Sequence, residues 1–181
     1  MEVVEEALNG VKLIRPTVFK DERGYFCETF NSQKLHDIIG AVDFVQDNQS
    51  LSQKGVLRGL HFQTPPFAQG KLVRVLNGSV QDVVVDLRKG SPTYGKSYSV
   101  VLKAEEFLML WVPPGFAHGF VTLENDTVFF YKVTKYYNKE SEGCLIWNDK
   151  DLSIDWQIKD VRVSEKDKKG TVFSNFKSLF S

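Results

Sequence analysis

His61 is one of three histidines in the sequence, and cationic residues flank it in the chain. Arg58 precedes it in the run Arg-Gly-Leu-His-Phe-Gln, and Lys71 follows it at the start of a long alternating segment. Histidine is the side chain best suited to accept a proton near neutral pH, and a lysine can stabilise an enolate oxygen. The three residues therefore predict proton abstraction next to a carbonyl of an anionic substrate. The alternative is a histidine satisfied by the core, with Arg58 and Lys71 in solvent.

Two further segments carry candidate acid-base groups. The rigid turn Pro113 to Gly115 leads into a strand that presents His118, which could orient a phosphate or act as a second acid-base group. Tyr131 lies on a strand that mixes aromatic and cationic residues, and its hydroxyl could protonate an enolate from the face opposite a histidine base. Each has a structural alternative, since a buried histidine after a turn and a core tyrosine with a bonded hydroxyl are both common.

The segments that must position these side chains are almost all β. Alternating patterns at Val11 to Ile14 and Gly24 to Phe30 predict strands, and 32–39 predicts a short helix that stops at Gly40. Asn77-Gly78 predicts a β-hairpin. Strands at roughly 8–12-residue spacing predict an all-β antiparallel jelly roll with a few short helices. The further strands are expected at 71–76, 79–87, 97–102, 107–112, 118–123 and 127–134, with another short helix from residue 164.

Composition narrows the class of protein. The 181 residues suit a single domain over 1–181, and a formal net charge of zero gives no field that favours nucleic acid. No apolar stretch approaches the ~20 residues that span a bilayer, and the first residues are acidic where a signal peptide would be basic. We therefore expect a soluble, cytoplasmic protein without nucleic-acid or membrane partners. Cys27 and Cys144 lack partners at metal-ligand spacing and are interpreted as ordinary buried thiols.

Taken together, these motifs resemble the dTDP-4-dehydrorhamnose 3,5-epimerase family from about Val11 to Asp167. The resemblance implies a cupin-type jelly roll that works as a homodimer without a metal or an organic cofactor. The matching segments, in the family's order, are 21–26, 46–50, 58–63, 70–74, 112–120, 130–132 and 164–167.

The resemblance also implies a mechanism. The substrate would be a dTDP-linked 4-keto-6-deoxyhexose, dTDP-4-dehydro-6-deoxy-D-glucose, converted to dTDP-4-dehydro-L-rhamnose. His61 would remove the protons at C3 and C5, Tyr131 would return a proton from the other face, and Lys71 would hold the enolate oxygen. Asp167 would orient His61, although the run Ser164 to Asp167 also fits a helix start with Ser164 as its cap.

Substrate-binding positions follow from the same resemblance. Arg23 and Glu28 would reach the site of the neighbouring subunit. Tyr137 would also touch the substrate, with Tyr136 as the competing candidate. Lys135 stands where many relatives carry an aspartate. This difference bears on which substrate is recognised more than on the type of reaction. The implied substrate-binding residues are Arg23, Glu28, Gln46, Asn48, Arg58, Lys71, His118, Glu142 and Lys166.

Three alternatives stay open at this point. A metal-dependent cupin enzyme would gather closely spaced histidines around an ion, but Gln63 stands two positions after His61, and His36 falls on the predicted helix. A nucleotide-sugar binding module would use the same residues without chemistry. An epimerase acting at C3 or C5 alone would differ only in how far the intermediate reorients and how long it stays.

Overall fold

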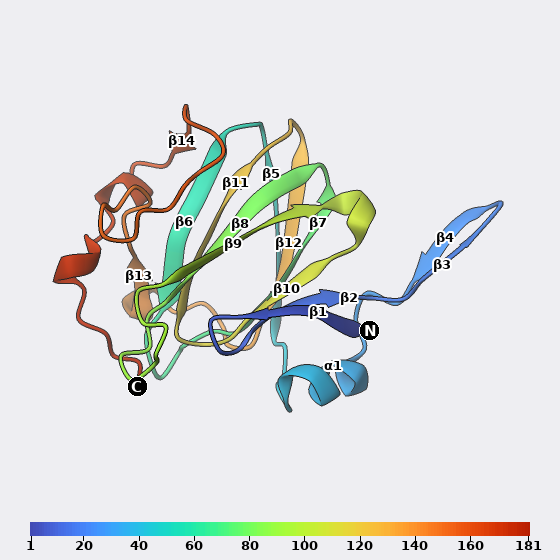
Figure 1. The fold of residues 1–181 in the computed structure, drawn as a ribbon, viewed down its shortest axis with the longest axis horizontal. Coiled ribbons are helices and arrows are strands. Elements are labelled where there is room, and N and C mark those ends of the chain that lie inside the picture. Colours follow the sequence, from blue (N-terminus) through green and yellow to red (C-terminus); the bar gives the residue numbers. More distant parts are fainter.

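Two facing β-sheets hold the largest apolar cluster of the protein between them (Figure 1). The structure is a computed structural model that describes all residues, 1–181. The first sheet has the order β1-β2-β10-β7-β12-β5, and the second has the order β13-β6-β11-β8-β9, with β14 pairing in parallel with β6. The cupin-type jelly roll predicted from the sequence is confirmed.

The first sheet consists of β1 (Glu2–Ala7), β2 (Val11–Arg15), β10 (Met109–Val112), β7 (Lys71–Asn77), β12 (Thr127–Val133) and β5 (Gln46–Ser52). The second consists of β13 (Glu142–Cys144), β6 (Val56–Gln63), β11 (Phe116–Thr122), β8 (Ser79–Asp86), β9 (Ser97–Lys103) and β14 (Arg162–Val163). A separate hairpin of β3 (Val18–Asp21) and β4 (Gly24–Cys27) projects from the body (Figure 1). The helical elements are α1 (Ser32–Ile39), η1 (Ala104–Glu106), η2 (Lys139–Ser141), η3 (Asp167–Lys169) and η4 (Phe173–Asn175).

The predicted helix is confirmed at both ends. The Asn31 side chain accepts a hydrogen bond from the Lys34 amide at 3.1 Å, which satisfies one free donor of the first turn. Gly40 ends the helix with a φ of 83°, a conformation that favours glycine. Leu35 is fully buried and packs with the outer face of the first sheet. None of the helices has the length and apolar character needed to cross a membrane.

The predicted hairpin at Asn77-Gly78 is wrong. Asn77 pairs with Val128 in the first sheet, whereas Ser79 pairs with Lys103 in the second. Strands β7 and β8 each already have two neighbours, so neither has a free edge for the other. Gly78, with a φ of 76°, instead supplies the turn that carries the chain across from one sheet to the other.

Other element boundaries also differ from expectation. β4 ends at Cys27 and does not continue to Phe30. Phe107 adopts a left-handed φ of 59° at the end of η1, so β10 begins at Met109. Strands β1 and β5 were not predicted, because their sequences are polar and lack the apolar alternation by which strands are recognised. β5 matters most, since it lines the cavity described below.

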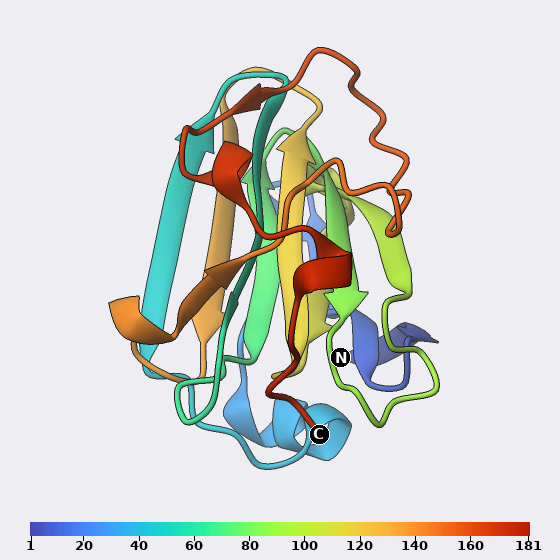
Figure 2. The ribbon, with the colours of Figure 1, turned by 90° about the vertical axis from the view of Figure 1, so that its left-hand side faces the viewer.

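Two smaller clusters cover the outer faces of the sheets. One joins the outer side of the second sheet to the C-terminal segment, which supplies the buried side chains of Leu152, Trp156 and Phe180. Figure 2 shows this segment, drawn in orange and red, passing over the second sheet. The other joins α1 to the first sheet through Leu35 and Trp111. The C-terminal segment is therefore held in place by apolar packing before it reaches the site.

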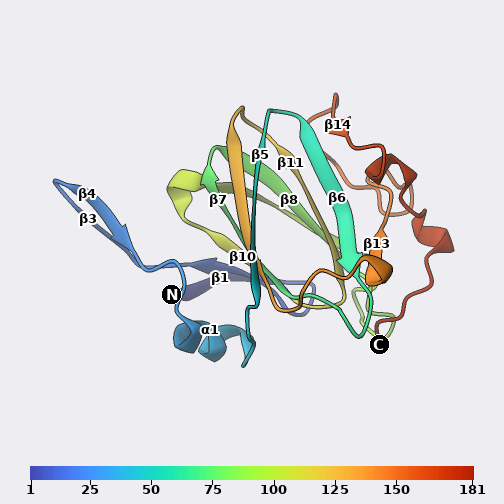
Figure 3. The same cartoon turned by 180° about the vertical axis from the view of Figure 1, so that it is seen from behind.

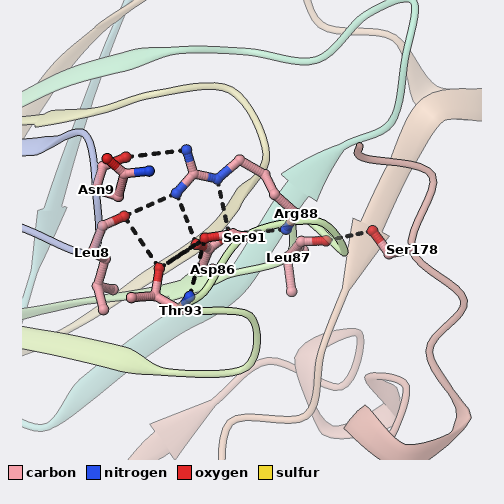
Figure 4. A network of polar contacts seen from close by, with 8 residues as sticks. All are labelled: Leu8, Asn9, Asp86, Leu87, Arg88, Ser91, Thr93 and Ser178. Atoms are coloured by element: carbon pink, nitrogen blue, oxygen red, sulfur yellow. Dashed lines mark hydrogen bonds and ion pairs between the residues drawn. The ribbon is translucent and has the colours of Figure 1, made fainter.

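A buried ion pair fastens the β8–β9 connection to the start of the chain (Figure 4). Asp86, with no exposed side chain, accepts hydrogen bonds from Arg88 Nη2 at 2.7 Å and from the hydroxyls of Ser91 and Thr93, both at 2.6 Å. Arg88 also donates to the backbone oxygen of Leu8 at 2.9 Å. These bonds hold the pKa of Asp86 below its usual value, although burial raises it. The carboxylate thus organises two loops at once.

Replacing Asp86 with asparagine is expected to destabilise the fold. The change leaves Arg88 without its charged partner, and breaking such a pair costs about 3 kcal/mol of unfolding free energy. Urea denaturation followed by circular dichroism measures this. The matched control is Glu106→Gln, which breaks an exposed pair with Lys103 and should change stability by no more than about 0.5 kcal/mol. Equal losses in both variants would contradict the organising role of Asp86.

Candidate active site

A cavity of about 630 Å³ opens between the two sheets and the C-terminal segment. A smaller space of about 220 Å³ adjoins it and shares four of its lining residues. Figure 3 shows the C-terminal segment running beside β6 at this side of the molecule. Predicted site residues in the larger space are His61, Lys71, His118, Tyr131, Asp167, Asn48, Arg58 and Lys166. The smaller space is also lined by Asn48, His61, Lys71 and Tyr131, and it adds Gln46, Glu142 and Tyr137.

His61 and Asp167 form a pair although 106 positions separate them in the sequence. His61 Nε2 lies 2.7 Å from Asp167 Oδ1, and the Gly59 amide donates to Oδ2 at 3.2 Å. The Asp167 amide donates to Ser164 Oγ at 3.1 Å. The sequence left open whether Asp167 orients His61 or belongs to a helix start capped by Ser164. Both hold, because the Ser164 hydroxyl accepts from the Asp167 amide while the Asp167 carboxylate bonds to His61.

The pairing fixes which nitrogen of His61 is free. Burial raises the pKa of Asp167, but the bonds from His61 and Gly59 outweigh it and leave that pKa below its usual value. Asp167 is thus an acceptor, and Nε2 of His61 donates to it. The lone pair then lies on Nδ1, which is the nitrogen able to take a proton.

Lys71 is buried in the wall shared by both spaces. Burial lowers the pKa of its ammonium to about 8, while the nearby Asp82 carboxylate acts in the opposite direction. Its Nζ donates to the His61 carbonyl at 3.4 Å. A cation is therefore held beside the histidine, with one neighbouring carboxylate favouring its charged form.

Asp82 is the group that sequence reasoning missed. It has no exposed side chain, and both carboxylate oxygens lie 3.0 Å from Nε2 of buried His118. Burial lowers the pKa of His118, so its neutral ring donates from Nε2 to Asp82. A signal existed in the sequence, because an aspartate inside the apolar run of β8 must find a partner when it is buried.

Tyr131 enters the cavity from the opposite sheet. It lies on β12 in the first sheet, whereas His61 lies on β6 in the second. Burial raises the pKa of its hydroxyl, and Arg58 acts in the opposite direction. The hydroxyl thus stays protonated near neutral pH and can donate into the cavity.

The smaller space ends in a polar group around Glu142. Tyr137 donates to Glu142 at 3.0 Å, and Lys166 forms an ion pair with the same carboxylate. Gln46 and Asn48, both on β5, are joined by a hydrogen bond of 2.9 Å. Donors and acceptors for a polar ligand are therefore concentrated at this end.

Two predicted residues lie away from the cavity. Arg23, in the turn between β3 and β4, bonds to Asp21 with its side chain 84% exposed. Glu28 pairs with Lys34 at 2.7 Å. Within one chain neither residue joins the other candidates, because the β3–β4 hairpin projects from the body (Figure 1). Lys135 does not line the cavity either, and its carbonyl accepts from Gln69.

Arg162 is a second residue that sequence reasoning missed. It lines the larger space together with Arg58. The Arg58 guanidinium donates to the Ser52 hydroxyl, and neither arginine forms an ion pair with a carboxylate. Arg162 lies opposite Val56 in the β14–β6 pairing, so its side chain shares a face with Arg58. The two cations make the mouth of the cavity positive although the whole chain is neutral.

Known proteins share this sequence and fold. The dTDP-4-dehydrorhamnose 3,5-epimerase family profile matches residues 5–175. The Shigella flexneri protein named dTDP-4-dehydrorhamnose 3,5-epimerase is 48% identical over 174 residues, covering 96% of each chain. The Elizabethkingia anophelis crystal structure of that name has a TM-score of 0.93 and 52% identity, covering 96% of this chain and 97% of that one.

A further solved structure contains a sugar nucleotide. The epimerase from Legionella pneumophila, in complex with dTDP-4-keto-L-rhamnose, has a TM-score of 0.93 and 43% identity, covering 97% of this chain and 94% of that one. Fold, site and comparisons together define an isomerase of the cupin-type jelly-roll class. The chain belongs to the dTDP-4-dehydrorhamnose 3,5-epimerase family.

The electrostatic coupling of Lys71 to Asp82 can be measured without any substrate. Removing a carboxylate that favours the ammonium should lower the pKa of Lys71 further below about 8 in Asp82→Asn. Titration of isotopically labelled lysine side chains by NMR reports this value. Asp47→Asn, which removes an exposed carboxylate from Lys132, is the matched control and should leave Lys71 unchanged. A Lys71 titration that is identical in Asp82→Asn and in the unmodified protein would contradict the coupling.

Proposed function

We propose that the chain epimerises dTDP-4-dehydro-6-deoxy-D-glucose at C3 and C5 to give dTDP-4-dehydro-L-rhamnose. One observation carries the proposal. A histidine held by a carboxylate and a protonated tyrosine enter the same cavity from opposite sheets. Inversion of a carbon centre needs a base on one face and an acid on the other. The relatives' names and the sugar nucleotide of the Legionella pneumophila structure support the choice of substrate.

His61 acts as the base in this proposal. The C4 ketone acidifies the protons on C3 and C5, and Nδ1 of His61 removes them in turn. Asp167 stabilises the imidazolium that forms, because its carboxylate is already bonded to Nε2. Lys71 places its ammonium at the developing enolate oxygen, where a buried positive charge stabilises the transition state.

Tyr131 acts as the acid. Its hydroxyl returns a proton to the carbon from the face opposite His61, and that delivery inverts the centre. Arg58 lies near enough to favour the tyrosinate that is left behind, and this lowers the energy of proton donation. Solvent then restores the proton to Tyr131 and takes up the proton held on Nδ1 of His61, so that acid and base are both reset before the second inversion.

The remaining residues bind the substrate. Arg58 and His118 contact the sugar and the diphosphate, and Arg162 adds a positive charge at the same end. The nucleotide contacts Tyr137 in the smaller space. The other proposed contacts in this smaller space and at its edge are Gln46, Asn48, Glu142 and Lys166.

A homodimer completes the site in this proposal. The exposed hairpin carries Arg23, and Glu28 directly after it, away from the cavity of its own chain, and it also exposes Phe19 and Phe26. We expect this hairpin to reach the site of the neighbouring subunit, so that Arg23 and Glu28 contact the nucleotide there. Residues 1–181 act as one domain, the location is cytoplasmic, and the steps above use only protein side chains.

The reaction is tested by incubation of the 4-keto substrate in heavy water. Deuterium is expected at both C3 and C5, detected by NMR or mass spectrometry. His61→Asn should lower exchange by at least about a hundredfold, because no base remains. Tyr131→Phe should keep part of the exchange but lose epimerisation, because deprotonation is spared while the opposite acid is absent.

Four outcomes of this experiment would count against the proposal. Exchange at C3 alone would mark a 3-epimerase, and exchange at C5 alone a 5-epimerase. Absence of exchange in the unmodified protein would indicate a binding module. Near-normal epimerisation in both His61→Asn and Tyr131→Phe would refute the acid and base assignments.

The shared site is tested by mixing two inactive proteins. Arg23→Ala and His61→Asn homodimers should each be impaired. In a mixed dimer, one site receives His61 from the first chain and Arg23 from the second, so that it is intact. Co-refolding the two variants should therefore raise the epimerisation rate above that of either parent. A rate equal to the average of the parents would contradict completion of the site by the neighbour.

A further inference from the structure

Cys144 lies directly beside the proposed catalytic pair. Strand β13 is antiparallel to β6, and Cys144 is the residue opposite His61 in that pairing. One ligand atom each of His61, Cys144 and Asp167 lie within 4.8 Å of one another. Cys27 and Cys144 were both predicted to be buried thiols, and this prediction is wrong: both are free, but both are only half-buried.

The three side chains form a donor set of a recognisable kind. A thiolate sulfur, an imidazole nitrogen and a carboxylate oxygen are the ligands that Zn²⁺ takes in proteins, and three such ligands with one open position are common. Bond lengths of about 2.0–2.3 Å place tetrahedral ligand atoms roughly 3.4–3.8 Å apart. The distance from His61 Nε2 to Asp167 Oδ1 is 2.7 Å, and no two of the three ligand atoms are more than 4.8 Å apart. These values lie on either side of the tetrahedral range, so small side-chain movements would bring the three atoms to the spacing that a bound cation needs.

The charges also suit a dication. A thiolate from Cys144 and the carboxylate of Asp167 together neutralise two positive charges in a place that is partly removed from water. The His61 side chain is 34% exposed, so an ion in the cavity can reach the group. Spacing along the sequence gave no sign of this cluster, because the sheet pairing and the C-terminal segment bring its members together.

We propose that His61, Cys144 and Asp167 form a binding site for a thiophilic divalent cation such as Zn²⁺ or Cd²⁺, and that the bound cation inhibits the enzyme. The cation takes the Cys144 sulfur, and the thiol proton leaves to solvent. At His61 the cation replaces the proton on Nε2, which moves to Nδ1, so one proton is released for each ion bound. Nδ1 then has no lone pair for the substrate.

The proton released gives the binding a pH dependence of known sign. Burial raises the pKa of the Cys144 thiol to about 12, so the free protein keeps this thiol protonated. Cation binding must displace that proton and therefore strengthens as pH rises. The inhibition, though not the binding, rests on the proposed role of His61 as the base.

The site is tested by titrating the full-length protein with CdCl₂. A cadmium–thiolate bond gives an ultraviolet charge-transfer band, which reports binding independently of activity. The unmodified protein and Cys27→Ser should show the band with equal affinity, since Cys27 lies on β4 and outside the cluster. Cys144→Ser should lack the band and bind at least about tenfold more weakly. If Cys144→Ser does not fold, His61→Asn removes the nitrogen ligand and should weaken binding by a similar factor.

Initial rates test the inhibitory half, with each variant compared to its own cation-free rate. CdCl₂ should inhibit the unmodified protein and Cys27→Ser, with recovery on addition of a chelator, and should inhibit Cys144→Ser at least about tenfold less strongly. No band in the unmodified protein, or a band lost only in Cys27→Ser, would overturn the site. A band without inhibition, or a rate that rises with the cation, would overturn the inhibitory role. Inactivity of the cation-free protein would count against the proposed function, but the charge-transfer band would still report whether the cation binds at this site.

Discussion

The hydrogen bond between Asp167 and His61 is the contact on which the rest of the site depends. It joins the C-terminal segment to β6, and two kinds of support hold it in place. The Gly59 amide donates to the carboxylate of the aspartate, and the Ser164 hydroxyl accepts from its backbone amide. Apolar packing of Trp156 and its neighbours keeps the C-terminal segment on the second sheet. A histidine with one free ring nitrogen follows from this arrangement, because the carboxylate leaves only Nδ1 available.

Local charge balance shapes the cavity more than the net charge of the protein does. The chain as a whole is neutral, yet the buried Asp82 carboxylate lies close enough to Lys71 to raise the pKa of its ammonium. Asp82 also holds His118, so a single carboxylate organises two groups in the wall. The unpaired guanidinium groups of Arg58 and Arg162 leave the mouth positive. Such a cavity favours an anionic ligand at its entrance and a developing negative charge at its base.

The features predicted correctly from the sequence are those that depend on residues close together in the chain. The helix at 32–39 was correct because its cap and its glycine stop act between near neighbours, and the jelly roll followed from the spacing of strands. The Asn77-Gly78 turn was misjudged because pairing depends on which strand edges are free, and distant strands had taken those edges. Asp82, Arg162 and the proximity of Cys144 to His61 were missed for a related reason. Their partners come from strand pairings that no spacing along the chain encodes.

A crystal structure of this protein with dTDP-4-dehydro-L-rhamnose bound tests the central claim most directly. If one face of the carbon is deprotonated and the other is reprotonated, the sugar ring should lie between His61 and Tyr131. Nδ1 of His61 should then lie within about 3.5 Å of C3 or C5 on one face of the ring. The Tyr131 hydroxyl should lie within the same distance of that carbon on the opposite face. The C4 oxygen should point at Lys71. A sugar ring with both side chains on one face, or a sugar outside this cavity, would contradict the account.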